Sequence, residues 1–566
     1  MIGLIAATAA GTAARDRLAA AWPGRTRAYE GPVREAVTRA FAECEQLVCF
    51  LAAGAAVRLI APLLSDKACD PGVVCVDEAQ QYAVALLGGH AGGSNELAEQ
   101  VCDVLGGRPV VTTATDAVSI PGLDTLGWPV EGAVAAVSRA MLDGSPVHLD
   151  AHDVHPLPPL PPNVTATTDS DVRIMVTDRA VTPDDRTAVL RPPTLVVGVG
   201  ASKGAPAEEV RQLIAAALAD AGLSPCSVAA LATVDAKAEE PGIVAAAERL
   251  GVPLVTYDAR RLGAVEVPHP SDAPLAAVGT ASVAEAAALL GAGAGGELLV
   301  PKRKSAPPSG PATATAAVAR RRPRGRLAVV GLGPGARDLL TPRARAELRR
   351  ASVVVGLDQY VGQIRDLLRP GTRVLESGLG AEEERARTAV AEARAGHAVA
   401  LIGSGDAGVY AMASPALAEA ADDIDVIGVP GVTAALAAAA ILGAPLGHDH
   451  VSISLSDLHT PWEVIERRVR AAAESDLVVT FYNPRSRGRD WQLPKALAVL
   501  AEHRSPQTPV GVVHAASRPD ERSEVTTLAG LDVTTVDMVT VVTVGNSATR
   551  QVAGRMVTPR GYRWQR

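Results

Sequence analysis

The sequence predicts a multidomain protein of the α/β class. Its 566 residues exceed what one hydrophobic core normally holds, and domains of roughly 100–200 residues would divide it into three or four. Short apolar runs such as "TLVVGVG", "LAVVGLG" and "DLVVTFYNP" alternate with Ala-rich stretches of helical character. Strands that are apolar on both faces are typical of sheets covered by helices on both sides. We therefore expect sheets rich in parallel strands.

Composition and charge exclude several classes of protein. Hydrophobic residues make up 48% of the chain, which indicates a globular and not a disordered protein. Residues 1–300 carry 20 Lys and Arg against 35 Asp and Glu, whereas residues 326–566 carry 27 of each. The six cysteines form no C-x-x-C pair, which favours reduced thiols. No uncharged apolar run reaches the ~18 residues of a membrane span. We expect a cytoplasmic protein without membrane or nucleic-acid partners.

Changes in composition predict the domain boundaries. The proline-rich stretch "HPLPPLPPN" ends a first domain and its extension, and "PPTLVVGVGASKG" opens the next unit. Residues 301–325 hold seven basic residues and no acidic ones. A nucleic-acid arm would have such a charge, but the Pro, Ala, Ser and Thr content favours an exposed, protease-sensitive linker. The expected parts are residues 1–125, a middle region 126–192, residues 193–300, the linker 301–325, and residues 326–566, which comprise two α/β subdomains with a seam near residue 445.

Four segments after the linker place Gly, small or polar residues directly behind an apolar strand. They are "VVGLGPG" (329–335), "ALIGSGDAGVYAM" (400–412), "VIGVPGVTAA" (426–435) and "VVTFYNPRSRGRD" (478–490). Each glycine alone is explained by a strand-to-helix turn that needs a positive φ. Ligands collect at the carboxyl ends of strands in an open α/β sheet. Together the four segments therefore predict a cleft for a small molecule.

The order and wording of these segments resemble the tetrapyrrole methylase family, whose members use S-adenosyl-L-methionine and contain two α/β subdomains. Within it, "SGDAGVYAMASP" and "FYNPRSRGRDWQLPKA" are similar to the precorrin-3B C17-methyltransferases, the ring-contracting enzymes of cobalamin biosynthesis. The resemblance covers residues 326–566. It implies that the G-x-G-P-G turn closes the floor of the methyl-transfer cleft. Ala336 and Ala407 depart from the family pattern, in which an acidic residue and a proline are common. The implied cofactor-binding residues are Gly333, Pro334, Gly335, Ser404, Gly405, Asp406, Val409, Thr433, Ala434, Asn483 and Ala515.

Proton transfer and substrate binding require further residues. Carbon methylation from a sulfonium mainly needs alignment, and ring contraction also needs groups that move protons. The candidates are His459, His514, Asp358 and Asp406, each with a structural role as the alternative. A macrocycle bearing many carboxylates calls for guanidinium groups. Because they follow strand ends, substrate-binding candidates are Arg485, Arg487, Arg489, Arg518 and Arg522, with a solvated charge run as the alternative.

In the first half, a glycine-flanked histidine stands out in "ALLGGHAGGSNELAEQV". His90 is followed by Glu96 at the expected start of a helix, whose unpaired first amides would suit an anion or a tetrahedral oxyanion. A capped helix entered through a flexible turn is the structural alternative. His90 and Glu96 are the weak catalytic candidates of this half. The dispersed histidines and cysteines show no metal-ligand spacing, so we expect no metal site.

Several phrases of the first half resemble the cobalamin biosynthesis hydrolases that open the lactone of cobalt-precorrin-5A and release acetaldehyde. They are "AAGAAVRLIAPLLSDKACDPGVVCVDE", "ALLGGHAGGSNELAEQV", "VVTTATDA", "GVGASKGAPAEEV", "LATVDAKAEEPGI" and "GTASVAEAAAL". The resemblance covers about residues 1–304 and implies N-terminal α/β hydrolase-like modules. It carries no catalytic assignment. On chemistry alone, Arg58, Lys67 and Lys237 would hold carboxylates, and His90, Asp235 or Glu96 would activate water or assist lactone opening. Because this half is acidic, a surface that binds an acidic macrocycle must be locally basic.

The sequence thus predicts a lactone hydrolase module joined to a methyltransferase, with S-adenosyl-L-methionine as cofactor and a tetrapyrrole (corrinoid) as substrate. We expect a homodimer through the methylase domain. An N-terminal half that only binds a corrinoid is one alternative. A corrinoid or nucleotide sensor is another, which the intact cofactor loops argue against. Whether the substrate carries cobalt stays open.

Overall fold

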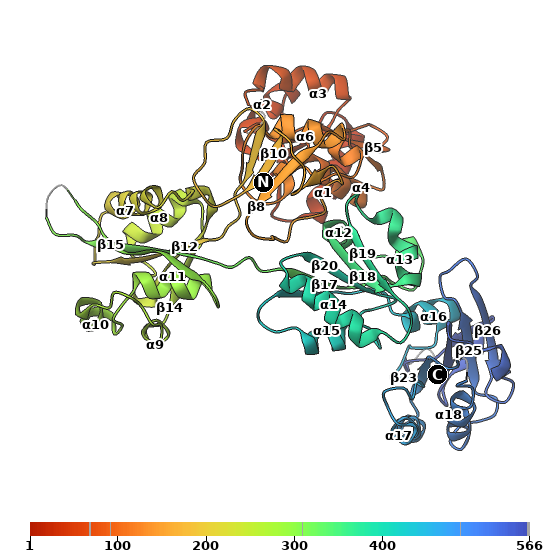
Figure 1. The fold of residues 1–566 in the computed structure, drawn as a ribbon. Coiled ribbons are helices and arrows are strands. Elements are labelled where there is room, and N and C mark those ends of the chain that lie inside the picture. Colours follow the sequence, from red (N-terminus) through yellow and green to blue (C-terminus); the bar gives the residue numbers. More distant parts are fainter. Residues whose placement is uncertain (67–68, 91, 308–309, 487, 563–566) are drawn as a thin grey trace. The chain divides into compact units, whose positions relative to one another are not determined.

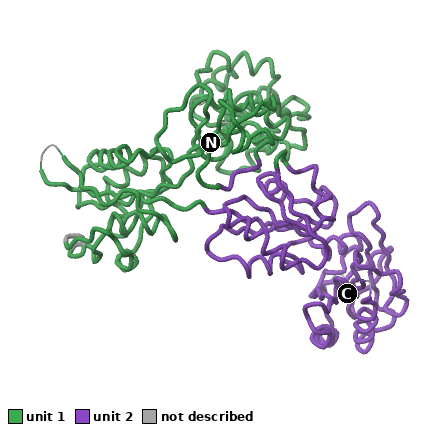
Figure 2. The backbone as a smooth tube through the Cα atoms, viewed as in Figure 1, with its two compact units in different colours: residues 1–154, 160–323, 369–371 green, residues 155–159, 324–368, 372–566 purple. Residues whose placement is uncertain are grey.

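The structure is a computed structural model, and it describes residues 1–66, 69–90, 92–307, 310–486 and 488–562. The chain forms two compact units, coloured separately in Figure 2. Unit 1 comprises Met1–Val154, Leu160–Pro323 and Arg369–Gly371, and unit 2 comprises His155–Pro159, Arg324–Leu368 and Thr372–Arg566. Within the described ranges, unit 1 contains three sheets and unit 2 contains two five-stranded sheets and a small three-stranded one. The α/β class is confirmed.

The first sheet of unit 1 has the order β2-β1-β3-β4-β5-β6. Its strands are parallel except for the antiparallel pair β4 and β5. Helices α1 and α4 cover one face, and α2 and α3 cover the other, so the strands are buried on both sides. The elements are β1 (Ile2–Ala6), α1 (Ala9–Ala21), β2 (Thr26–Tyr29), α2 (Val33–Glu43), β3 (Gln46–Phe50), α3 (Ala53–Ile60), β4 (Gly72–Val76), β5 (Tyr82–Leu87), α4 (Ser94–Leu105), β6 (Arg108–Val110) and α5 (Ala114–Ala117).

The middle region forms a sheet of its own, in the order β7-β11-β10-β8-β9. Its elements are β7 (Val130–Gly132), α6 (Val134–Leu142), β8 (Val147–Ala151), β9 (Val164–Thr165), β10 (Arg173–Val176) and β11 (Thr187–Leu190). The buried Arg191 lies directly after β11. Its Nε donates to Glu131 Oε2 on β7 at 2.7 Å, and its Nη1 donates to the carbonyl of Thr177. This region is therefore a folded layer and more than a connection.

The third sheet has the order β14-β13-β12-β16-β15, with α7 and α8 on one face and α11 on the other (Figure 1). Its elements are β12 (Leu195–Ala201), α7 (Ala207–Asp220), β13 (Val228–Val234), α8 (Pro241–Leu250), β14 (Leu254–Tyr257), α9 (Ala259–Gly263), α10 (Asp272–Val278), α11 (Ala284–Ala292), β15 (Glu297–Lys304) and β16 (Ala314–Arg320).

The expected linker at residues 301–325 is wrong at residues 301–304 and 314–320, which are strands. Residues 301–304 belong to β15, and 314–320 form β16, which pairs along its whole length with β12. The segment "ATAAVAR" is buried because small apolar residues fill both sides of a central strand. Arg320 ends β16 with its Nε donating to Asp178 at 2.7 Å, so its charge is used inside unit 1. The third domain therefore extends to Arg320, and only residues 321–325 separate it from the next sheet.

The first subdomain of unit 2 is a fully parallel sheet in the order β19-β18-β20-β17-β21. Helices α12 and α13 pack on one face, and α14 and α15 on the other (Figure 1). The elements are β17 (Arg326–Gly331), α12 (Pro342–Arg350), β18 (Val353–Leu357), α13 (Asp358–Ile364), β19 (Arg373–Ser377), α14 (Glu382–Arg394), β20 (Ala398–Gly403), α15 (Ala413–Glu419) and β21 (Asp425–Val429).

The second subdomain is a mixed sheet in the order β23-β24-β27-β25-β26. Helices α17 and α18 cover one face, and α16 packs on the other. The chain crosses between the subdomains through α16 and β22, which ends next to the expected seam near residue 445. The elements are α16 (Ala434–Leu442), β22 (Gly443–Ala444), β23 (His450–Ser454), α17 (Trp462–Glu474), β24 (Val478–Tyr482), α18 (Gln492–Ala501), β25 (Pro509–His514), β26 (Arg522–Thr527), β27 (Thr540–Val544), β28 (Arg550–Val552) and β29 (Arg555–Val557).

Candidate functional site

Three glycine turns meet at the carboxyl edge of the parallel sheet in unit 2. Gly333, behind β17, and Gly405, behind β20, exchange two backbone hydrogen bonds of 3.0 and 2.8 Å. Gly431, behind β21, packs against both strands, because a Cβ there would lie 2.1 Å from the Gly405 carbonyl oxygen and 2.7 Å from that of Gly331. No side chain fits in such a contact. The glycines therefore allow the backbones of the three turns to pack directly against one another.

Asp406 holds two of these turns together. Its Oδ1 accepts a hydrogen bond from the Gly408 amide at 2.8 Å, and its Oδ2 accepts one from the Gly431 amide at 3.0 Å. Hydrogen bonds from amides to a carboxylate are stronger than those to neutral acceptors. The carboxylate thus orients the loop that also contains Ser404 and Val409, and a direct contact with a cofactor stays a prediction.

Strand ends of the second sheet carry unusual backbone conformations. Asn483, behind β24, has φ 50°, Ala515, behind β25, has φ 48°, and Ser517 has φ 61°. Left-handed conformations are costly for residues other than glycine and persist where the surrounding contacts enforce them. Asn483 is held by a hydrogen bond from its Nδ2 to Ser454 Oγ at 3.1 Å.

Side chains join the two edges inside unit 2. Arg518 Nε donates to the Pro334 carbonyl at 2.9 Å, and the Ala336 amide donates to Ser517 Oγ at 3.2 Å. Gly335 also lies against Arg518, because a Cβ there would be 2.6 Å from the arginine Cγ. The expected cofactor-binding residues therefore come from strand ends that are in direct contact with one another.

Two tyrosines at this junction were missed by the sequence reasoning. The Tyr482 hydroxyl accepts a hydrogen bond from the Ala435 amide at 2.9 Å and lies 2.6 Å from Thr433 Oγ1. The Tyr410 hydroxyl donates to the Ser452 carbonyl at 2.8 Å. Both tyrosines stand inside the quoted motifs, but the sequence does not show that Tyr410 bonds to the other subdomain or that Tyr482 bonds to the start of α16.

The proposed substrate arginines have structural partners. Arg485 Nη1 donates to the carbonyls of Val533 and Thr534, both at 3.1 Å. Arg489 Nη1 donates to the carbonyls of Leu455 and Asn483, and burial lowers the pKa of its guanidinium. Both arginines therefore brace loops. Arg487 lies outside the described residues.

The proton-transfer candidates of this half are not equivalent. His514 is 15% exposed, with Nδ1 at 3.3 Å from Asp537 and Nε2 at 3.5 Å from Asp520. His459 is exposed beside Leu458, and Asp358 is exposed at the start of α13, where it accepts a bond from the Gln359 amide. Only His514 therefore combines shielding from solvent with ionisable partners.

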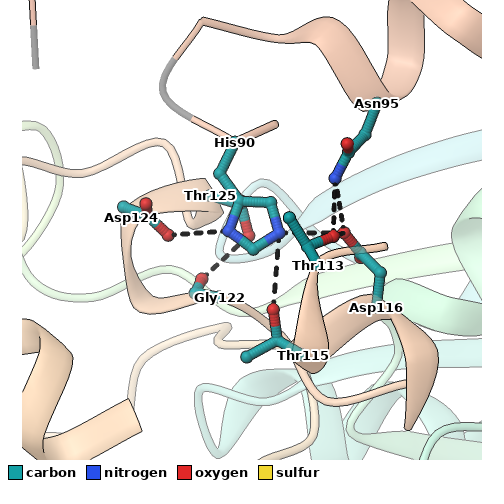
Figure 3. Close-up of polar contacts among 8 residues, drawn as sticks. All are labelled: His90, Asn95, Thr113, Thr115, Asp116, Gly122, Asp124 and Thr125. Carbon is teal, nitrogen blue, oxygen red and sulfur yellow. Dashed lines mark hydrogen bonds and ion pairs between the residues drawn. The ribbon is translucent and has the colours of Figure 1, made fainter. Parts of the chain in front are cut away.

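In the first domain, His90 lies between two carboxylates (Figure 3). Its Nε2 is 2.8 Å from Asp116 Oδ2, and its Nδ1 is 3.3 Å from Asp124 Oδ1. Asp116 Oδ2 also accepts bonds from Asn95 Nδ2 at 2.7 Å and Thr113 Oγ1 at 2.6 Å. The strand ends of β5 and β6 bring these residues together, because the two strands run parallel and end at the same sheet edge.

The two carboxylates change the acid–base behaviour of this cluster. Hydrogen bonds to Asp116 and then to Asp124 raise the pKa of His90 to about 9, against the opposing effect of burial. The bond from His90 is also the main cause that lowers the pKa of Asp116 to about 2. The imidazole is therefore protonated near neutral pH, with both ring nitrogens facing carboxylates, and it is a poor general base.

The expected oxyanion site at the start of α4 is wrong in its geometry. The amides of Ser94 and Asn95 donate to the carbonyls of Gly88 and Gly89 at 3.1 and 3.2 Å, so the glycine-rich turn itself satisfies them. Glu96 is exposed on the first turn of α4, away from the hydrogen bonds that surround His90. What the sequence missed is Asp116, which organises the cluster from 26 residues further along the chain.

The other residues considered for this half lie apart from the cluster. Arg58 Nη1 donates to the Gly54 carbonyl within α3, and Lys237 pairs with the buried Glu240 at 2.9 Å. Asp235 begins a short 3₁₀ turn behind β13. Lys67 lies outside the described residues. Among the residues that are described, no group of three His, Cys, Asp or Glu side chains is arranged to hold a metal ion, and no helix is long and apolar enough to cross a membrane.

Models of different protein families match the two halves of the chain. The model of the tetrapyrrole (corrin/porphyrin) methylases matches residues 326–532. The models of the cobalamin synthesis G N-terminal domain and C-terminus match residues 35–116 and 195–319. The match to the cobalamin synthesis G C-terminus ends at residue 319, one residue before the end of β16.

Individual relatives align with the second half. A probable cobalt-factor III C(17)-methyltransferase of Salmonella typhimurium is 48% identical over 239 residues, which are 42% of this chain and 99% of the relative. A precorrin-3B C(17)-methyltransferase of Sinorhizobium sp is 41% identical over 250 residues, covering 42% of this chain and 97% of the relative. The crystal structure of the methyltransferase CobJ is 39% identical, with a TM-score of 0.40, and covers 42% of this chain and 100% of that one. Through this half, the chain belongs to the tetrapyrrole methylases.

Proposed function

We propose that residues 326–566 methylate C-17 of precorrin-3B or cobalt-factor III, with contraction of the ring, in cobalamin biosynthesis. The observation that carries the proposal is the meeting of glycine turns from one sheet with strained strand ends from the other. This junction lies in the half that aligns with relatives named for the same reaction.

The junction fits S-adenosyl-L-methionine as the methyl donor. Gly405 has φ 67°, and a Cβ there would fill a space 3.6 Å from Thr433 Cα and 3.7 Å from the Ala434 amide nitrogen. This glycine therefore leaves room above the turn, in contrast to Gly431. Half-buried polar groups of Ser404, Thr433 and Asn483 border the same strand ends. Such a set suits a ligand with an amino acid end and a nucleoside end.

The protein's task in this reaction is alignment. The bound cofactor supplies an activated methyl group, so correct placement of donor and acceptor provides most of the rate enhancement. Asp406 fixes the turns on the cofactor side. On the other side, His514 lies between Asp537, 3.3 Å from its Nδ1, and Asp520, 3.5 Å from its Nε2, and it is the proposed proton carrier of the ring contraction. A macrocycle carboxylate would be bound by the terminal guanidinium nitrogens of Arg518, whose Nε is taken by the Pro334 carbonyl, while Arg485 and Arg489 shape the loop.

Methyl transfer from labelled S-adenosyl-L-methionine tests this proposal directly. The full chain is incubated with metal-free precorrin-3B or with cobalt-factor III, and label in the tetrapyrrole is measured. Label in one of the two substrates identifies the branch of the pathway. Label in neither would refute the proposal, provided that the protein is folded. Gly431→Ala is the matched negative control, because its Cβ would collide with two carbonyl oxygens.

For the first half we propose a cobalt-precorrin-5A lactone hydrolase. The matches to cobalamin synthesis G models and the His90 cluster support it. A protonated His90 would orient Asp116, whose Oδ1 is the carboxylate oxygen left to face water or substrate. Acetaldehyde release by the full chain tests the proposal, with Asp116→Asn as the impaired variant and Glu96→Gln as the control. Corrinoid binding without acetaldehyde would favour the binding-module alternative.

A further inference from the structure

A pair of tyrosines connects the two subdomains of unit 2. Tyr482 is the last residue of β24, and its hydroxyl bonds to residues at the start of α16, on the crossover from the first subdomain. Tyr410 stands behind β20 of the first subdomain, and its hydroxyl bonds to Ser452 on β23 of the second. The two rings pack with centroids 5.3 Å apart at an angle of 55°. The Tyr410 bond and the ring contact therefore cross between the subdomains, and the Tyr482 bonds hold the point where the chain enters the second one.

Tyr482 replaces the missing cap of α16. Thr433 is the N-cap residue of this helix, but its side chain makes no capping hydrogen bond. The Ala435 amide donates to the Tyr482 hydroxyl instead, and Thr433 Oγ1 lies 2.6 Å from the same oxygen. Free amides in the first turn of a helix need a partner. The start of α16 is thus positioned by the second subdomain.

Backbone strain is concentrated around the pair. Tyr410 has φ 52° and Asn483, directly behind Tyr482, has φ 50°. Conformations of this kind cost free energy and remain populated only when other contacts compensate for it. Tyr410 is 53% exposed, so its hydroxyl bond and its contact with Tyr482 are what hold the ring in place, because little of the side chain is buried in a core.

We infer that Tyr482 is a positioning residue that sets the Thr433–Ala434 turn for the cofactor, and that Tyr410 makes this setting depend on the second subdomain. The inference rests on the proposed methyltransferase function, because it assigns the turn to cofactor binding. It adds that the cofactor site is assembled only when the tyrosine pair bridges the subdomains. Neither tyrosine touches the cofactor in this mechanism.

Phenylalanine variants of the full chain test the inference. Tyr482→Phe leaves the Ala435 amide without its partner, and loss of one such bond corresponds to a change of about 3- to 10-fold in affinity. We expect the dissociation constant of S-adenosylhomocysteine, measured by calorimetry, to rise by this factor. The tetrapyrrole KM should change by less than twofold. Tyr360→Phe, on α13 against the core of the first subdomain, is the matched control and should behave as the wild type.

A double-mutant cycle with Tyr410→Phe separates positioning from general stability. If the pair acts as one unit, the effects of the two substitutions should not add. The dissociation constant of S-adenosylhomocysteine for the double variant should then equal that of the single variant with the lower affinity. A Tyr482→Phe protein that unfolds at a lower temperature yet binds S-adenosylhomocysteine as the wild type does would overturn the inference and leave the methyltransferase proposal intact. A wild type that methylates neither tetrapyrrole and does not bind S-adenosylhomocysteine would overturn both.

Discussion

Replacing His90 with Gln should weaken the first domain by an amount that depends on pH. Raising the pKa of His90 from 6.5 to about 9 corresponds to about 3 kcal/mol of stabilisation, since one pKa unit is worth about 1.4 kcal/mol. The His90 side chain is 15% exposed and that of Asp116 is 32% exposed, so solvent screens the pair only in part. The low pKa of Asp116 reports the same interaction and is not added to it.

Because folding raises the pKa of His90, the stabilisation decreases as the pH rises. The folded pKa lies above the unfolded one, so the stabilisation is fully present below pH 6.5 and disappears as the pH rises through 9. Below pH 4 the partner matters, because Asp116 becomes protonated as the pH falls through about 2 and the ion pair is then lost. The effect of the substitution should therefore be largest between about pH 4 and 6.5.

Hydrogen exchange of the segment that follows β6 is the appropriate assay, because local opening is measured without unfolding the whole chain. At pH 6, amides of residues 113–125 should exchange about 100-fold faster in His90→Gln than in the wild type, since 1.4 kcal/mol corresponds to a factor of ten. The ratio should approach one above pH 10. Amides of β12 serve as the internal control. A ratio that stays constant between pH 6 and 10 would refute the assignment of a charged His90.

Three further outcomes are expected. Asp406→Ala removes two bonds from amides to a carboxylate, each worth roughly 1.5–3 kcal/mol, so S-adenosylhomocysteine affinity should fall by at least tenfold in calorimetry; an unchanged affinity in a folded variant would mean that the cofactor site lies elsewhere. Arg489→Gln and Arg518→Gln should both lower the unfolding temperature of unit 2, because each loses a bond to a backbone carbonyl, but only Arg518→Gln should also raise the tetrapyrrole KM; equal effects of the two on KM would contradict the assignment of Arg518 to the substrate. Limited proteolysis that separates active halves should cut at residues 321–325 and not within 314–320, because the latter form a central strand; early cleavage inside β16 would contradict the pairing with β12.

The pattern of apolar residues along the chain predicted the buried strands of the fold. The apolar runs that end at Gly331, Gly403 and Tyr482 are strands, because burial on both faces leaves a direct compositional signature. The same reasoning failed for β16, since seven basic residues nearby hid a short strand made of Ala, Thr and Val. The basic residues and prolines lie mostly before and after β16. The structure of β16 itself is determined by its pairing with β12 and β15.

The contacts that organise the sites join residues far apart in the chain, and one sequence gives no measure of such distances. Asp116 was inside a quoted phrase, but its bond to His90 depends on β5 and β6 ending side by side. Tyr482 was quoted as well, and its partner at Ala435 is reached only when α16 packs on the second sheet. Residue type and place in the chain predicted Asp406 as a cofactor-binding residue, and that role stays a prediction; its bonds to the amides of Gly408 and Gly431 depend on two turns that are 25 residues apart.

The close packing of Gly431 predicts the effect of missense mutations at its codon. Every missense change of a glycine codon adds at least one carbon, and even alanine would place that carbon 2.1 Å from the Gly405 carbonyl oxygen. All single-nucleotide missense alleles at this codon should therefore disable the methylase half. The lesion leaves the reading frame intact, and the fold of residues 1–320 should persist. If both proposed activities hold, a strain that carries it should lose only the methylation step, and a separate copy of residues 326–566 should complement it.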